Sequence, residues 1–279
     1  MPGDFISSTP SRQGVMKGFH DTLSGRINSL LLTKRLAMSR NRILTVFILF
    51  AIAMAFLEGA VVSYLRALYY PEGFAFPLKM MPPSIALTEL LREAATLIML
   101  VTVALLAGKT RMERLAFFLL GFGVWDIFYY VFLKVILGWP ASLVTWDILF
   151  LLPTPWVGPV MAPVINSLTM IVLAFYIIHF THQGRKATFS GYEWILLIVG
   201  SMVILAAFTE EYIRFMSGAF RFTDFFSSSR QAAIMRYTST FVPRHFKWYL
   251  FLGGVIVQLA AVVLYIAGGM KHRPAVSRD

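Results

Sequence analysis

Acidic side chains recur inside segments that are otherwise apolar enough to cross a membrane. A carboxylate in hydrocarbon is costly, so one that is retained usually faces a bundle interior or a water-filled cavity, where it has a partner. Carboxylates in such a place can bind a cation, carry a proton or act as an acid–base pair. The residues concerned are Glu58, Glu89, Glu93, Asp126, Asp147, Glu210 and Glu211.

The densest group of charges lies in the segment from residue 88 to residue 96. Glu89 and Glu93 are four residues apart and share a helix face, and Arg92 is three residues from Glu89 and can pair with it. One arginine cannot neutralise two buried carboxylates, so we expect a second cation or a bound proton. The alternative is an ion-pair cluster that only joins helices, because buried ion pairs are often structural.

A second group surrounds Asp126. Tyr129 and Tyr130 follow it by three and four residues, so their hydroxyls can reach its carboxylate. The tripeptide Trp-Asp-Ile occurs around both Asp126 and Asp147, either as a faint internal repeat or by chance. If it is a repeat, Asp147 points at the same cavity as Asp126. The alternative for Asp126 is an aspartate satisfied by the tyrosines for packing alone.

The elements that must position these residues are membrane spans. The chain has 279 residues, of which 58% are hydrophobic and 14% charged, against about 25% charged in soluble domains. A spanning helix needs about 20 mostly apolar residues. Six segments qualify, which predicts an all-α integral membrane protein with six transmembrane helices. They are 43–68, 84–108, 114–138, 159–180, 192–213 and 247–270.

One further apolar segment is too short to cross. Residues 142–153 precede a run of four prolines between positions 153 and 163. Proline fits the first turn of a helix but not its interior, so the chain is expected to be extended before the fourth span. We interpret 142–153 as a short re-entrant or interfacial half-helix.

The polar segments predict the domain organisation. Residues 1–42 form a basic N-terminal tail, 43–270 a membrane domain, and 271–279 a short C-terminal tail. Apolar residues at helical spacing between 16 and 31 fit an interfacial helix, with a disordered tail as the alternative. Within the domain, residues 212–246 form an amphipathic outer loop with a short helix near 228–237.

Lysine and arginine counts predict the orientation. The side of the membrane that holds both termini carries 15 of them and the other side 9. This bias favours both termini in the cytoplasm, with the plasma (inner) membrane as the location. The net charge of +11 then indicates contact with anionic lipid at the cytoplasmic side, and not with nucleic acid.

Depth along the helices predicts where the acids lie. A rise of about 1.5 Å per residue in about 30 Å of hydrocarbon puts acids from four spans into the outer half of the membrane. We therefore expect an acidic cavity that opens to the outer face. The candidate residues for binding a ligand or cation are Glu58, Glu89, Arg92, Glu93, Asp126, Tyr129, Tyr130 and Asp147.

Several chemistries are excluded by composition. The chain has no cysteine, which removes thiolate metal sites and iron–sulfur clusters. Its five histidines lie outside the middle of the spans, which argues against an intramembrane haem. No nucleotide-binding fingerprint occurs. No cofactor is firmly implied, although a cluster of oxygen ligands suits a divalent or monovalent cation.

Three functions fit these features. The first is a transport-type protein that binds or translocates a cation, a proton or a small polar ligand. The second is a non-catalytic subunit or assembly factor of a larger membrane complex, bound to partner membrane proteins. The third is a membrane enzyme that acts on an outer-leaflet lipid or polar substrate through paired carboxylates. Its catalytic residues and any metal ligands are not assigned.

Overall fold

A computed structural model describes residues 39–185, 188–227 and 229–271. The chain divides into two units, Met1–Val46 and Phe47–Asp279, and the helical bundle discussed below belongs to the second. The interfacial helix expected between residues 16 and 31 and the C-terminal tail both lie outside the described residues.

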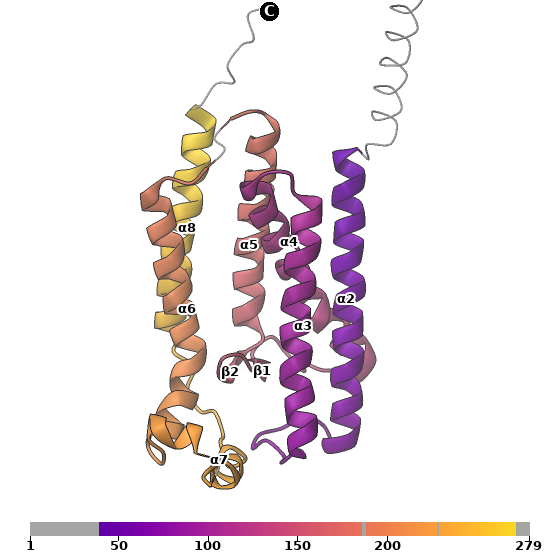
Figure 1. The fold of residues 1–279 in the computed structure, drawn as a ribbon, viewed down its shortest axis with the longest axis vertical. Helices are drawn as coiled ribbons and strands as arrows, with labels where there is room; N and C mark the ends of the chain where they lie inside the picture. The colour runs from indigo at the N-terminus through magenta and orange to yellow at the C-terminus, as the bar shows by residue number, and fades with distance from the viewer. Residues whose placement is uncertain (1–38, 186–187, 228, 272–279) are drawn as a thin grey trace, which may run out of the picture. The chain divides into compact units, whose positions relative to one another are not determined.

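Within the described residues, six long helices are each apolar enough to cross a membrane (Figure 1). They are α2 (Arg40–Tyr69), α3 (Pro83–Ala107), α4 (Arg111–Leu137), α5 (Met161–His182), α6 (Gly191–Ser217) and α8 (Trp248–Lys271). Large apolar side chains stay exposed on them, such as Leu106 at 86% and Val135 at 76%. Helices that are apolar on their outer face need lipid as solvent. The chain is a polytopic helical membrane protein, as predicted.

Capping residues set the start of two spans. At the start of α4, the Thr110 side chain accepts a hydrogen bond from the Glu113 backbone N–H (3.1 Å), and the Glu113 carboxylate accepts one from the Thr110 N–H (3.3 Å). Ser190 and Glu193 form the same capping box at the start of α6. Each box satisfies backbone N–H groups that the first helical turn leaves without acceptors.

The half-helix predicted for residues 142–153 is wrong. This segment instead contains strand β1 (Trp146–Phe150), which pairs antiparallel with β2 (Trp156–Pro159), so that Asp147 lies opposite Gly158. The prolines that follow β1 cannot donate the N–H bonds that a helix requires. A hairpin pairs the backbone groups of one strand with those of the other, which non-helical backbone at membrane depth needs.

The hairpin packs between two groups of helices. Phe150 belongs to a buried cluster with Met54, Leu100 and Trp125 from α2, α3 and α4. On the other strand, the Trp156 ring stacks on Phe208 of α6 at 5.9 Å between centroids. The Phe150 and Trp156 rings are themselves 5.6 Å apart. The hairpin thus connects the α2–α3–α4 group with the α6–α8 pair.

The loop after α6 is structured. It contains a 3-10 helix, η1 (Phe222–Phe226), and a short helix, α7 (Gln231–Thr238), close to the helix expected near 228–237. Tyr237 stacks on Phe215 of α6 at 4.4 Å between ring centroids. The Thr238 and Tyr212 hydroxyls lie 3.2 Å apart. These contacts hold α7 against the end of α6.

The close contact of α6 with α8 gives a first prediction. A Cβ added at Gly254 would lie 2.9 Å from the Gly200 carbonyl oxygen, whereas one added at the neighbouring Gly253 meets nothing within 4 Å. We expect Gly254→Ala to lower the unfolding free energy by about 1–3 kcal/mol, because the helices must move apart. Gly253→Ala is the matched control and should be neutral or slightly stabilising. Thermal unfolding in detergent measures both, and equal stability of the two variants would contradict the prediction.

Candidate functional site

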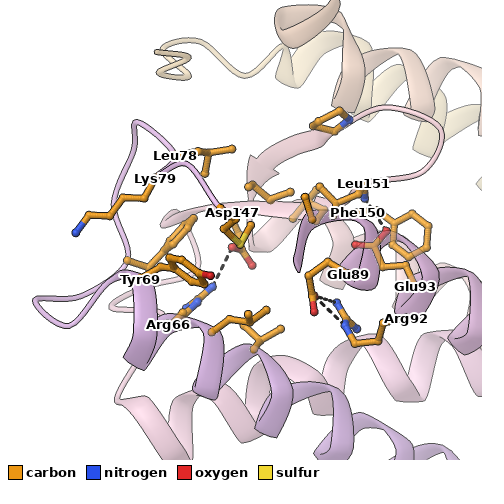
Figure 2. A pocket seen from close by; sticks show the side chains of 18 of the residues that line it. Arg66, Tyr69, Leu78, Lys79, Glu89, Arg92, Glu93, Asp147, Phe150 and Leu151 are labelled. Carbon is orange, nitrogen blue, oxygen red and sulfur yellow. Dashed lines mark hydrogen bonds and ion pairs between the residues drawn. The ribbon is translucent and has the colours of Figure 1, made fainter. Parts of the chain in front are cut away.

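A cavity of about 300 Å³ lies among α2, α3, α4, β1, the loop between α2 and α3, and α7 (Figure 2). The residues that line it include seven of the eight predicted site residues. The eighth, Tyr130, does not line the cavity, but its hydroxyl donates a hydrogen bond to the lining residue Asp147. The seven are Glu58, Glu89, Arg92, Glu93, Asp126, Tyr129 and Asp147.

The three central acids lie at similar distances from the ends of their helices. Glu58, Glu93 and Asp126 lie on three helices, each about 15–17 Å along the axis from a helix end at Tyr69, Pro83 or Leu137. This common depth brings their carboxylates to one cavity. Helix rotation, which one sequence does not specify, turns all three inward.

The remaining two acids lie elsewhere. Glu210 pairs with Lys247 at 2.6 Å and with Arg214 at 3.6 Å. The Glu211 carboxylate accepts the backbone N–H groups of Arg244 and His245 at 2.8 and 3.2 Å. Both residues therefore hold the segment after α6 and lie outside the cavity lining.

Arg92 is shared by two carboxylates. Its guanidinium contacts Glu58 on α2 and pairs with Glu89 one turn away at 2.9 Å. Glu58 also accepts a hydrogen bond from the Thr96 hydroxyl. The predicted pairing of Arg92 with Glu89 is confirmed, and the contact with Glu58 adds a second acid to the same cation.

Glu93 lies beside this cluster and has a neutral donor. Its carboxylate accepts the backbone N–H of Leu151 at 2.8 Å, and its side chain is buried. This hydrogen bond joins the end of β1 to α3. Three carboxylates, those of Glu58, Glu89 and Glu93, thus lie around the single guanidinium of Arg92, which leaves local negative charge in excess.

The predicted partners of Asp126 are wrong. Its carboxylate accepts a hydrogen bond from the Ser167 hydroxyl of α5 at 2.8 Å. The Tyr130 hydroxyl instead donates to Asp147 of β1 at 3.4 Å. The reason is the position of neighbouring elements, because Asp126 faces α5 whereas Tyr130 faces the hairpin. Spacing within one helix cannot distinguish these two acceptors.

Arg66 is a cavity residue that the predicted set omits. It is buried and pairs with buried Asp147 at 3.1 Å. Its guanidinium carbon lies 3.6 Å from the Trp139 ring centroid and 4.5 Å from that of Phe74. Arg66 follows Glu58 by eight residues, which places both on one face of α2. That spacing is a signal from which its position could have been predicted.

Asp147 lies in β1, outside the spans, and its ionisation is perturbed. Burial raises the pKa of its carboxyl to about 7, although Arg66, the Ile148 backbone N–H and the Tyr130 hydroxyl each act to lower it.

No group of three or more His, Cys, Asp or Glu side chains in the described part of the chain is arranged to hold a metal ion. The carboxylates of the cavity are instead separated by arginines, hydroxyls and apolar side chains.

The chain matches no family model, no curated protein and no solved structure. Its functional interpretation therefore depends on the chemistry of the cavity.

The perturbed carboxyl gives a second prediction. Because the pKa of Asp147 is raised on folding, the folded chain binds more protons than the unfolded chain between about pH 4 and about pH 7. Its contribution to stability should therefore fall as pH rises through that window. We expect Asp147→Asn to flatten the decline of unfolding temperature with pH, and Glu72→Gln, at an exposed position, to leave it unchanged. An Asp147→Asn profile parallel to that of the wild type would contradict this assignment.

Proposed function

We propose that the protein is a binding or transport-type membrane protein whose cavity takes a small organic cation, such as a protonated amine with an apolar body. One observation carries the proposal. The described residues that line the cavity contribute five carboxylates against three basic side chains, Arg66, Lys79 and Arg92. Of these three, Lys79 is exposed.

Charge balance supports a cationic ligand. A buried carboxylate without a counter-charge costs several kcal/mol, so it binds a proton or a cation. Glu93 is the acid that we assign to this role, because it is buried and its hydrogen bond comes from the neutral Leu151 N–H. Glu58 and Glu89 already share the guanidinium of Arg92.

The walls of the cavity support an organic ligand over a bare ion. Ligand sites in proteins combine apolar and aromatic walls with a few polar groups and occupy roughly 300–1,000 Å³. The aromatic rings here can also attract an ammonium group through their faces. They belong to Tyr69, Tyr70, Phe74, Trp125, Tyr129 and Phe150.

The backbone near Glu93 supports a transport-type site. Leu151, at the end of β1, reaches Glu93 at about 15 Å from the start of α3. Irregular backbone at such depth is typical of substrate sites in transporters, where it lines a cavity. We also propose, from the lysine and arginine bias, that the termini are cytoplasmic and the cavity opens outward.

The roles of membrane-complex subunit and of lipid-directed enzyme stay predictions. The contact of basic N-terminal residues with anionic lipid and the location in the plasma membrane stay predictions as well.

Thermal unfolding in detergent tests the proposal. We expect hexylamine at 100 times its Kd to stabilise the wild type by about 2.7 kcal/mol, as for any ligand that binds only the folded state. Glu93→Gln should fold and lose this gain, because it removes the charge that the ammonium faces. Glu72→Gln, an exposed acid outside the cavity lining, should keep it.

Mg²⁺, Ca²⁺, Mn²⁺ and Na⁺ form a parallel series in the same assay. Suppose that one of these ions stabilises the wild type, that Glu93→Gln abolishes this stabilisation, and that the amine has no effect. The ligand assigned to the site would then be a metal ion and not an organic cation. No gain from any amine or ion would refute the cation site.

A further inference from the structure

Two buried N–H donors that belong to the cavity lining lack an acceptor. They are Nη1 of Arg66 and Nε1 of Trp125. Arg66 is 8% exposed and Trp125 is 7% exposed. Nearly all buried polar groups in proteins are hydrogen-bonded, so such donors call for an explanation. A donor left on a buried charged group is especially costly.

The surroundings of Arg66 hold its guanidinium in one orientation. Asp147 accepts from Nη2, and the Trp139 and Phe74 rings lie within 4.5 Å of the guanidinium carbon. The side chain is therefore largely desolvated while one nitrogen keeps unused donors. A guanidinium presents several N–H groups in a plane that matches the oxygens of a carboxylate or phosphate.

An arginine lies beside carboxylates on each side of the cavity. Figure 2 shows Arg66 paired with Asp147 and beside Tyr69 on one side, and Glu89, Arg92 and Glu93 together on the other. The first side offers a donor without an acceptor, and the second an excess of carboxylate. A ligand that satisfies both sides needs a positive charge for the surplus carboxylate and an oxygen acceptor for the unused Arg66 N–H, and an anionic oxygen is the stronger kind of acceptor.

We propose that the ligand is a zwitterion, whose ammonium group faces Glu93 and whose anionic oxygen group accepts from Arg66. This inference deepens the proposed function and depends on it for the ammonium site. The shared chemistry is an ammonium and an anionic oxygen in one molecule, which both water-soluble zwitterions and zwitterionic lipid headgroups possess. Apolar lining residues such as Leu78, Met80 and Met81 would contact the rest of an amphiphile.

Four probes separate the parts of this ligand. Hexylamine has the ammonium and a tail, phosphoethanolamine has both charges without a tail, and dihexanoyl phosphatidylethanolamine has all three. Dihexanoyl phosphatidylglycerol has the anion and tails without the ammonium. Isothermal titration of the full chain in detergent gives a Kd for each probe.

We expect a zwitterionic probe to bind about tenfold or more tightly than hexylamine. The zwitterion makes a charged hydrogen bond that hexylamine cannot make, and removal of such a bond costs about this much affinity. Phosphatidylglycerol should bind more weakly than phosphatidylethanolamine. If phosphatidylethanolamine binds more tightly than phosphoethanolamine, the zwitterionic group belongs to a lipid headgroup. If phosphoethanolamine binds more tightly, the ligand is a water-soluble zwitterion.

A variant pair assigns the effect to Arg66. Because Asp147 would lose its counter-charge, we compare Arg66→Gln/Asp147→Asn with Asp147→Asn alone. The double variant should lose the zwitterion's advantage and keep its affinity for hexylamine. Arg111→Gln, at an exposed position outside the cavity lining, should behave as wild type.

The possible failures are distinguishable. Hexylamine binding with no gain for either zwitterion would overturn this inference and leave the proposed function standing. Equal binding of the two dihexanoyl lipids, or an advantage that survives loss of Arg66, would overturn it as well. If no probe binds, the proposed function and this inference fall together.

Discussion

Backbone hydrogen bonding inside the helical bundle is the constraint on which the rest of this structure depends. The prolines between positions 153 and 163 prevent a continuous helix there, yet buried backbone N–H and C=O groups still need partners. The hairpin of β1 and β2 meets this demand by pairing its own strands. Where β1 ends, the Glu93 carboxylate accepts the Leu151 N–H. One acidic side chain of α3 therefore completes the backbone pairing and faces the cavity.

The charges of the cavity follow from the same arrangement. The hairpin brings Asp147 to Arg66, and α2 and α3 bring Glu58 and Glu89 to Arg92. Buried ion pairs of this kind are weak evidence for stability, since their desolvation cancels much of their attraction. Their uneven distribution is more informative. Carboxylate is in excess near Glu93, and donors are in excess at Arg66.

The membrane spans could be predicted from the sequence, because a run of about 20 apolar residues is visible in it. The grouping of the acids at similar positions along the helices could be predicted as well, because the rise per residue of a helix is constant. The hairpin could not be predicted, since a short apolar run fits a strand or a helix equally well. The hydrogen-bond partners that lie on other elements could not be predicted from the sequence either. Tyr130 bonds Asp147 and Ser167 bonds Asp126, because of helix rotation and strand placement that local spacing does not encode.

The short helix α7 connects the cavity to a distant part of the bundle. Met235, Thr238 and Ser239 form part of the cavity wall, while Tyr237 stacks on Phe215 of α6. α6 in turn packs closely along α8 through Gly200 and Gly254. The carboxylates of the cavity come from α2, α3, α4 and β1. One wall of the cavity therefore depends on packing between helices that supply none of its carboxylates.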